Sequence, residues 1–405
     1  MLVLLAFIVF CIPCDLIKTS TMQRFLLILC VSILSFGCKN NSTEEKTENK
    51  QIFKSEEVSF VIDTIVSGIK LPFGMDWLPD GRAIITDRGK EIESISLLNI
   101  DSGTVTALCQ VPPVYKDGQG GMLDILVHPD YKNNGWIYFS YSSMKPDSTN
   151  STVVNRAKLE NNCLTNRELI FEAKPYYKSP NHFGCRLVIK DGYLFISMGE
   201  RYFCKDSAQL LTNDLGKIIR LHDDGRIPVD NPFVNTKDAL PEIWSYGHRN
   251  PQGLAINPAN GEVWENEHGP KGGDEINNIK PGANYGWPVI CWGVDYDGKP
   301  IGKGLTEKEG MEQPLKYYVP SIGPSGMMFY TGDKFPKWKN HLFIGALALQ
   351  HINHLTIDGS KIVKEERLLE GQKLRVRFVK QGPDGYIYFG VDGGMILRLR
   401  PAGDE

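Results

Sequence analysis

One structural unit recurs six times along the chain beyond residue 55. In each copy, a strand of alternating apolar residues leads into a P-x-G or D-G turn, and a second strand rich in Ile, Tyr and Phe follows. The copies begin at Phe73, Gly121, Cys185, Gly253, Gly326 and Val376. Repeats of about fifty to seventy residues with turns at a fixed offset are typical of a β-propeller, in which each copy is the inner part of a four-stranded blade. The sequence therefore predicts an all-β fold, a six-bladed β-propeller over residues 56–402.

Composition agrees with many short strands joined by tight turns. The 405 residues include 40 Gly and 24 Pro, and 10% of the residues are aromatic, as expected for such an all-β chain. A stack of unrelated hairpins in two β domains is the alternative, but it does not explain the shared order of strand, turn and aromatic strand. The net charge of −3 leaves no basic surface for nucleic acid, which argues against polyanion binding.

The first 55 residues predict export and a tether. From Met22 the chain reads MQRFLLILCVSILSFGC, in which one Arg, an apolar stretch and small residues precede Cys38. This layout predicts a signal peptide region over residues 1–37, with Met22 as an alternative start of translation. Gly37-Cys38 resembles the end of a bacterial lipobox, so we expect acylation of Cys38; ordinary cleavage and an uncleaved anchor stay as alternatives. The polar residues 38–55 predict a flexible tether, and the protein is expected to be a periplasmic or cell-envelope lipoprotein.

Five cysteines remain beyond this leader, and their wide spacing matches no metal-binding pair. They are Cys109, Cys163, Cys185, Cys204 and Cys291. Because their number is odd, at least one thiol is free, and the sequence leaves the disulfide pairing open.

In a propeller, the loops that leave the innermost strands converge at one face, where a site can form. The segment GHRNPQG, at 247–253, places Arg249 and Asn250 directly before an apolar strand, which favours an anionic or carbonyl ligand. In KLRVRF, Arg375 and Arg377 project from the same side of a strand and match a ligand with several carboxylates. Plain surface charges are the alternative interpretation of both segments.

Two further segments suggest a base and a cation site. In SPNHFGCRLVI, His182 precedes a strand of the third repeat, where an imidazole suits a general base, although a lone His is more often structural. The segment EHGPKGGDEINNIKPGANYGWP, at 267–288, holds Asp274 and Glu275 among glycines and exposed carbonyls. Such oxygens are the ligands that Ca²⁺ prefers, and a solvated turn is the alternative.

At these segments the chain resembles the soluble pyrroloquinoline quinone-dependent aldose sugar dehydrogenases and quinoprotein glucose dehydrogenases, which have a six-bladed propeller. The matching segments, in the order of the family, are GQGGMLDILVHPDY, HFGCRLVI, LGKIIRL, GHRNPQGLA, EHGPKGGDEIN, NYGWP, PSGMMFY and RVR. They extend from about residue 70 to residue 400. Co-occurrence of GHRNPQG, GGDEIN and NYGWP makes the resemblance specific, whereas any one of these motifs alone would be modest.

The resemblance implies a quinoprotein oxidoreductase that converts the C1 hydroxyl of an aldose sugar to a lactone. His182 would take the proton of the anomeric hydroxyl while hydride passes to pyrroloquinoline quinone, and Arg249 would stabilise the oxygen of the reduced quinone. The implied cofactor contacts are Gln119, Arg249, Asn250, Tyr296, Arg375 and Arg377. The implied Ca²⁺ ligands are the carbonyls of Gly269 and Pro270 beside the cofactor, and Glu275 with the carbonyl of Tyr285 at a second site. Electrons would leave through an external acceptor.

Several positions depart from the pattern of the glucose dehydrogenases. Asn181 and Glu200 stand where these enzymes carry Asp, and His268 stands where they carry Gln. Ala348 falls near a Lys that touches the cofactor in relatives.

Two other functions stay open at this point. A calcium-dependent lactone hydrolase would need a metal ringed by carboxylates in the channel and would give Arg375 and Arg377 no role. A noncatalytic carbohydrate- or protein-binding propeller is favoured by Ala348 and opposed by the presence of His182 together with Arg249.

Overall fold

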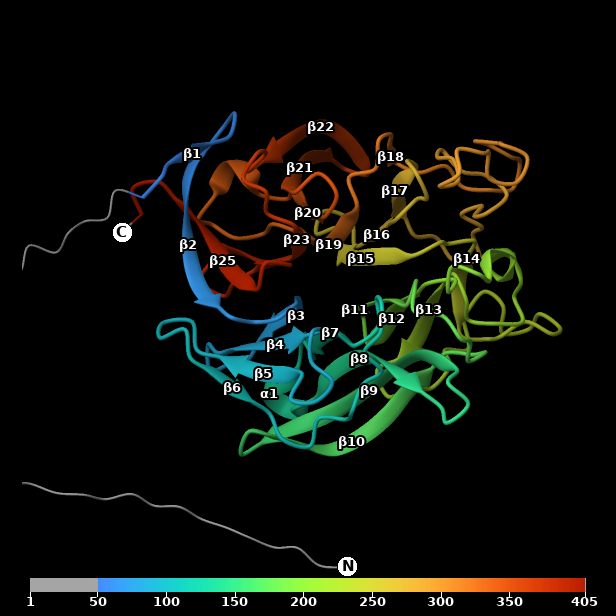
Figure 1. The fold of residues 1–405 in the computed structure, drawn as a ribbon, viewed down its shortest axis with the longest axis horizontal. Coiled ribbons are helices and arrows are strands. Elements are labelled where there is room, and N and C mark those ends of the chain that lie inside the picture. Colours follow the sequence, from blue (N-terminus) through green and yellow to red (C-terminus); the bar gives the residue numbers. More distant parts are fainter. Residues whose placement is uncertain (1–49, 405) are drawn as a thin grey trace, which may run out of the picture. The chain divides into compact units, whose positions relative to one another are not determined.

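The computed structural model describes residues 50–404, and these residues form six antiparallel sheets set around a central axis (Figure 1). Five sheets have four strands each and follow one another along the chain, and the sixth has five strands. The predicted six-bladed β-propeller is therefore confirmed. The predicted signal peptide region at 1–37, the acylation site at Cys38 and most of the predicted tether at 38–55 lie outside the described residues. The end of that tether is described, and Phe53–Lys54 form a strand paired with Ser59 and Phe60, so the propeller begins before the predicted residue 56.

The five four-stranded blades follow the chain around the ring. The first contains β3 (Pro72–Trp77), β4 (Ala83–Asp87), β5 (Ile95–Leu98) and β6 (Val105–Ala107). The second contains β7 (Met122–Val127), β8 (Ile137–Met144), β9 (Asn150–Glu160) and β10 (Cys163–Glu172). The third contains β11 (Gly184–Lys190), β12 (Tyr193–Met198), β13 (Lys217–His222) and β14 (Ile243–Tyr246). The fourth contains β15 (Pro251–Ile256), β16 (Val263–Glu267), β17 (Asp274–Asn278) and β18 (Lys316–Tyr318). The fifth contains β19 (Pro324–Phe329), β20 (Leu342–Ala346), β21 (His351–Asp358) and β22 (Lys361–Leu368).

The sixth blade joins the two ends of the described chain and so closes the ring. It is built from β23 (Val376–Gln381), β24 (Ile387–Val391), β25 (Met395–Pro401), β2 (Ser59–Ser67) and β1 (Phe53–Lys54). β2 pairs antiparallel with β25, and Asp63 of β2 accepts hydrogen bonds from Arg398 at 2.8 Å and Arg400 at 3.0 Å of β25. Backbone pairing and ion pairs together hold the N-terminal strand against the C-terminal one.

Helices are short in the described part of the chain. They are α1 (Tyr131–Asn134), η1 (Lys205–Gln209) and η2 (Pro336–Trp338). Within residues 50–404, no helix has the length and apolar character needed to cross a membrane.

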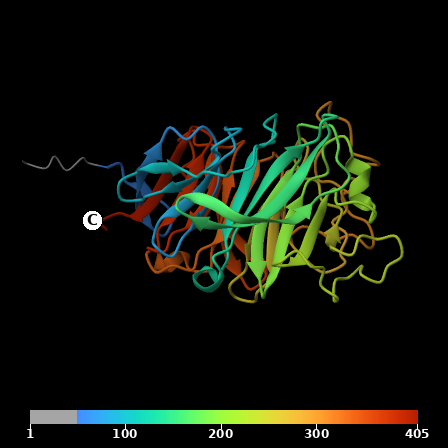
Figure 2. The ribbon, with the colours of Figure 1, turned by 90° about the horizontal axis from the view of Figure 1, so that it is seen from below.

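The predicted repeats coincide with the innermost strands β3, β7, β11, β15, β19 and β23. Each of these strands has a register shift near its beginning, where pairing with its neighbour is interrupted. At such irregularities, successive side chains no longer point alternately to the two faces of the sheet. Figure 2 shows the ring from its side, with strands crossing its thickness and loops at both faces, so these six irregular segments lie together at one face.

One disulfide joins the first two blades. It connects Cys109, after β6, to Cys163 at the start of β10. Cys185, Cys204 and Cys291 are free thiols, which resolves the pairing that the sequence left open.

Arg186 of β11 ties the innermost strands together at the centre of the ring. Its Nε donates to the carbonyl of Gln252 in β15 at 2.7 Å, and its Nη2 donates to the carbonyl of Arg377 in β23 at 3.0 Å. Its Nη1 donates to the carbonyl of Phe73 in β3 at 2.9 Å and to Asp124 Oδ1 in β7 at 3.0 Å. One buried guanidinium thus connects the first strands of five blades.

Replacing this residue should destabilise the whole propeller. Arg186→Ala leaves the Asp124 carboxylate and three carbonyls buried without their donor, so we expect a loss of about 3–5 kcal/mol of unfolding free energy. Urea denaturation followed by tryptophan fluorescence measures this loss. Arg82→Ala is the control, because Arg82 forms an exposed ion pair with Asp80 and should cost less than about 1 kcal/mol. Equal losses in both variants would contradict a central role for Arg186.

Candidate functional site

A cavity of about 230 Å³ lies at the face where first strands begin and second strands end. All six blades contribute to it. Its lining residues are Phe73, Arg88, Gln119, Leu123, Phe183, Gly184, Gln252, His268, Leu347, Arg375 and Arg377. Each comes from the segment at the start of a first strand or from the residues directly after a second strand, so the propeller repeat itself brings them together.

His182 lies beside this cavity in a strained, well-held conformation. Its φ of 51° is in the left-handed region, and its backbone N–H donates to Gln119 Oε1 at 2.8 Å. Its Nδ1 lies 3.0 Å from Oε1 of Glu200, a fully buried carboxyl group. Because Nδ1 carries the proton in this contact, Nε2 is left as the acceptor. Within residues 50–404, the imidazole makes no other hydrogen bond, so Nε2 is free to accept a proton.

The surroundings of His182 favour a neutral imidazole. Burial lowers the pKa of His182 below its ordinary value of 6.5; the hydrogen bond to Glu200 opposes this shift, and the charge of Arg249 adds to it. A neutral, buried imidazole that is oriented by a carboxylate is suited to general base catalysis.

Arg249 and Asn250 are buried next to the cavity and keep unused donors. The Nη1 of Arg249 donates to the carbonyls of His268 at 3.0 Å and Gly269 at 2.7 Å. The backbone N–H groups of Arg249 and Asn250 both donate to Glu267 Oε2. Among the described residues, Arg249 Nε and Asn250 Nδ2 have no hydrogen-bond partner. Because buried donors are normally satisfied, these two atoms indicate a ligand with acceptor oxygens.

The opposite wall of the cavity is strongly cationic. Arg377 binds Asp392 through two hydrogen bonds of 2.9 and 2.8 Å. Arg375 donates to the carbonyl of Leu347 at 2.8 Å and to Asp392 at 3.3 Å. The side chain of Arg88 forms no hydrogen bond or ion pair within residues 50–404, and burial together with Arg377 lowers the pKa of Arg88 to about 9. Three guanidinium groups against one carboxylate favour an anionic ligand.

Sequence reasoning missed Arg88 and Asp392 as site residues. Both lie directly after the second strand of a blade, as Glu200 does. Aligning the ends of the second strands among the six repeats would have found this shared place, in addition to the positions before the first strands.

The predicted calcium loop at 267–288 contributes to a buried acidic cluster that also includes His248 and Glu265. His248 Nδ1 lies 3.7 Å from Glu265 and 3.5 Å from Glu267, and one ligand atom of each of these three residues lies within 4.8 Å of the others. Asn277 Nδ2 bridges Glu265 Oε1 at 2.8 Å and Glu275 Oε2 at 3.2 Å. Burial and the charge of Glu267 raise the pKa of Glu275 to about 8. Buried carboxyl groups of this density are unfavourable when ionised unless a cation joins them.

The other predicted calcium residues are placed differently. The ring of Tyr285 stacks on His248 with centroids 4.6 Å apart, so it joins the cluster of Glu275. The carbonyl of Gly269 accepts from Arg249, and the buried Pro270 follows it. Asp274 accepts the backbone N–H groups of Gly269 at 2.9 Å and Gly323 at 2.8 Å, so its carboxyl group organises the loop.

Tyr296 does not line the cavity, because its side chain belongs to an exposed loop and is 59% accessible. Its predicted contact with the cofactor stays a prediction.

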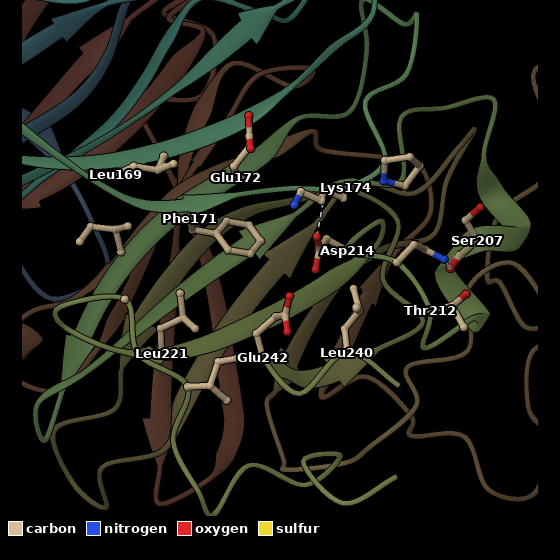
Figure 3. Close-up of a pocket in the computed structure, with 15 residues that line it drawn as sticks. Leu169, Phe171, Glu172, Lys174, Ser207, Thr212, Asp214, Leu221, Leu240 and Glu242 are labelled. Carbon is tan, nitrogen blue, oxygen red and sulfur yellow. Dashed lines mark hydrogen bonds between the residues drawn. The ribbon is translucent and has the colours of Figure 1, made fainter. Parts of the chain in front are cut away.

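A larger cavity, of about 800 Å³, lies between β10 and the residues around β13 (Figure 3). There Asp214 accepts the backbone N–H of Lys174 at 2.7 Å, as Figure 3 shows. None of the predicted site residues lines that larger cavity, so we place the candidate site in the smaller one.

Comparison with known proteins shows the family of this chain. The family model described as glucose/sorbosone dehydrogenase matches residues 69–398. This chain belongs to that family. The aldose sugar dehydrogenase of Escherichia coli is 40% identical over 347 residues, which cover 84% of this chain and 92% of that protein. The crystal structure of the E. coli enzyme in its apo form superposes with a TM-score of 0.81, covering 84% of this chain and 99% of that one at 40% identity.

A second solved structure belongs to a more distant relative. The pyrroloquinoline quinone-bound form of the aldose sugar dehydrogenase from Streptomyces coelicolor is 25% identical, with a TM-score of 0.69, covering 84% of this chain and 98% of that one. As a member of the glucose/sorbosone dehydrogenase family, the chain is an oxidoreductase related to sugar dehydrogenases.

Three of the positions that depart from the glucose dehydrogenase pattern have defined surroundings in the structure. Glu200 replaces Asp and still reaches His182. His268 is neutral, because burial lowers the pKa of His268 to about 3, and its Nε2 donates to the carbonyl of Pro324 at 2.7 Å. Ala348 is exposed, and Arg375, bonded to the neighbouring Leu347 carbonyl, supplies positive charge beside it.

We expect burial to hold the pKa of His182 below 6.5, and Glu200 to raise that pKa partly back toward its ordinary value. Glu200→Gln removes an anion that favours the imidazolium, so the pKa of His182 should fall further. Titration of ¹³C-labelled histidine by NMR measures both values, with the His182 signal assigned by its loss in His182→Gln. The control is Glu242→Gln, at the distant larger cavity, which should leave the signal unchanged. A pKa of His182 at or above 6.5, or one insensitive to Glu200→Gln, would contradict the geometry.

Proposed function

We propose that this protein oxidises the C1 hydroxyl of aldose sugars to lactones, with pyrroloquinoline quinone as cofactor and Ca²⁺ as its metal. One observation carries the proposal. Nε2 of His182 is oriented and free to accept a proton, and it lies beside a cavity that has cationic side chains and buried donors without a partner in the described chain. Family membership supports the oxidoreductase class, and the quinone-bound relative from S. coelicolor supports this cofactor.

The residues present fit the proposed cofactor. Pyrroloquinoline quinone is a flat molecule with three carboxylates, and Arg88, Arg375 and Arg377 provide three guanidinium groups on one wall of the cavity. Arg249 Nε and Asn250 Nδ2 are buried donors without a partner in the described chain, so quinone or carboxylate oxygens would satisfy them. Gln119 and, after a change of its exposed loop, Tyr296 would complete the set of contacts. When bound, the quinone supplies a two-electron acceptor for the C1 hydride of the sugar.

The chain itself supplies the base and the charge. The anomeric hydroxyl donates its proton to Nε2 of His182, and Glu200 at Nδ1 stabilises the imidazolium that results. The cation of Arg249 stabilises an oxygen that gains negative charge nearby, which is effective because the site is buried. Gln119 holds the backbone of His182, so the imidazole keeps its direction between turnovers.

Calcium would be held at the two places that the sequence predicts. The carbonyl of Gly269 accepts a hydrogen bond from Arg249 at the edge of the cofactor cavity, and Pro270 follows it in the chain; Ca²⁺ would bind these two carbonyls together with the anionic cofactor. Glu275 belongs to the buried cluster with Glu265, Glu267 and His248, and a divalent cation there would neutralise its charge and admit the carbonyl of Tyr285 as a further ligand.

We place the protein outside the cytoplasm, anchored by acylation of Cys38. The disulfide between Cys109 and Cys163 supports this location, since disulfides persist in oxidising compartments. An external acceptor would then reoxidise the cofactor. The lining of the cavity counts against a lactone hydrolase, because its lining residues include Arg88, Arg375 and Arg377 but no Asp or Glu that could ring a metal. A noncatalytic binding propeller is the other alternative. In the assay below, such a protein would not oxidise any aldose.

Dye-coupled oxidation of a panel of aldoses tests the proposed reaction. Activity should require both pyrroloquinoline quinone and Ca²⁺, and His182→Ala should lower kcat by about 10²–10⁴-fold, because the base is lost. The variant should still bind the quinone, which equilibrium dialysis with absorbance measures. The control is His222→Ala, because His222 is a half-buried histidine whose ring lies at a tilt to that of Tyr193 and does not line the cavity. Quinone binding without turnover of any aldose, or full activity in His182→Ala, would overturn the proposed mechanism.

Thermal unfolding tests the calcium cluster separately. Without quinone, Ca²⁺ at about 100 times its Kd should add about 2.7 kcal/mol of stability and raise Tm. Glu275→Gln should lose most of this increase, because it removes a carboxylate ligand from the cluster. The control is Glu307→Gln, which changes an exposed carboxyl group and should keep the increase in stability that Ca²⁺ gives. A Tm that does not respond to Ca²⁺ in the unmodified protein would remove Glu275 and Tyr285 from the metal site.

A further inference from the structure

We propose that Tyr202 and Phe203 form an aromatic platform for the sugar substrate beside His182. Tyr202 would pack against the ring that is oxidised, and Phe203 against the next unit of a reducing-end oligosaccharide. The inference rests on the proposed function and names two substrate contacts and a substrate class for the same site.

The two rings are both exposed and lie next to each other. Both belong to the segment between β12 and η1, which also carries Glu200. Phe203 is 63% accessible and Tyr202 is 37% accessible. The rings pack edge-to-face with centroids 4.9 Å apart, so they form one stepped apolar surface.

The backbone under these rings is held in a costly conformation. Arg201 and Tyr202 have φ values of 65° and 64°, the left-handed region that disfavours residues with a Cβ. Glycine at either position would relieve this strain, yet the chain places a buried arginine and an aromatic residue there. Strain of this kind is maintained where the surroundings over-determine it and is common at functional sites.

Arg201 anchors the platform to the wall of the cavity. It is only 1% accessible and donates to Asn150 Oδ1 and to the carbonyl of Ser179. Its guanidinium carbon lies 3.5 Å from the centre of the Phe183 ring, and Phe183 lines the cavity. The contacts therefore run without interruption from the cavity through Phe183 and Arg201 to the two exposed rings.

Tyr202 also touches the proposed base. Its ring lies edge-on to the imidazole of His182, with centroids 5.3 Å apart. A sugar that gives its proton to Nε2 of His182 would lie next to Tyr202 as well. Phe203 lies one ring farther out, where a second sugar unit would extend from the first.

The chemistry of the platform suits a carbohydrate. A pyranose ring has an apolar C–H face and a polar rim, so its face can bury aromatic area while its hydroxyl groups stay hydrated. Only the reducing end of an oligosaccharide offers a free C1 hydroxyl, so the chain would extend outward from His182 over Phe203.

Binding of sugars that cannot be oxidised tests the platform independently of the proposed reaction. Methyl glycosides of a monosaccharide and of the matching disaccharide have no free C1 hydroxyl, and saturation-transfer NMR with the purified full-length protein in detergent measures their binding. Tyr202→Ala should weaken both ligands about 10-fold, and Phe203→Ala should weaken the disaccharide about 10-fold more than the monosaccharide. Phe203→Trp should restore disaccharide binding. Tyr317→Ala, a similarly exposed ring on β18, is the matched control and should change neither Kd.

Kinetics of the loaded enzyme then separate the possible outcomes. In Phe203→Ala, the ratio of KM for the disaccharide to KM for the monosaccharide should rise about 10-fold. A change in KM for the electron acceptor in place of this ratio would overturn the proposal and assign Phe203 to acceptor docking. Unchanged sugar binding in both alanine variants would overturn the platform while leaving the dehydrogenase intact. Loss of binding in both variants, without any sugar oxidation by the unmodified protein, would support the platform and refute the proposed reaction.

Discussion

The guanidinium of Arg186 connects the architecture of the ring to the shape of the site. Three of its hydrogen bonds end on the carbonyls of Phe73, Gln252 and Arg377, and these same residues line the cavity. Because each comes from a different blade, one central group sets the distance between three walls of the site. The floor of the cavity is therefore a consequence of how the propeller closes, and the loops above it carry the chemistry.

Charge is arranged in two adjoining regions. The cavity is cationic, with Arg88, Arg375 and Arg377 on one wall, whereas the cluster of Glu265, Glu267 and Glu275 behind it is acidic. Glu267 links them, because its carboxylate accepts the backbone N–H groups of Arg249 and Asn250. Burying charges of one sign together is unfavourable in each region. An anionic cofactor would neutralise the cationic cavity, and a bound cation would neutralise the acidic cluster beside it.

Much of the fold and part of the site could be predicted because their signals are local. The innermost strands follow from alternation and turn residues within each repeat, and the predicted copies coincide with β3, β7, β11, β15, β19 and β23. Gln119, Arg375 and Arg377 line the cavity, and His182, Arg249 and Asn250 lie beside it, since all of them occupy the start of a first strand. Partners on the neighbouring strand of the same blade were missed, because they lie at the end of a second strand and not at the start of a first one. Asp392 is fifteen residues from Arg377, and no pattern near either one predicts that they pair.

The sequence by itself determined the class of fold, the number of blades and the residue types available for chemistry, because strand periodicity and turn preference act over a few neighbouring residues. Tertiary structure alone decided which of those residues meet. It placed Glu200 beside His182, brought Arg88 into the lining of the cavity, left Tyr296 exposed and set the ring of Tyr202 against His182. These outcomes depend on strand pairing, burial and the closure of the ring, which bring together residues that are distant in sequence; no pattern in one short segment predicts which of them meet.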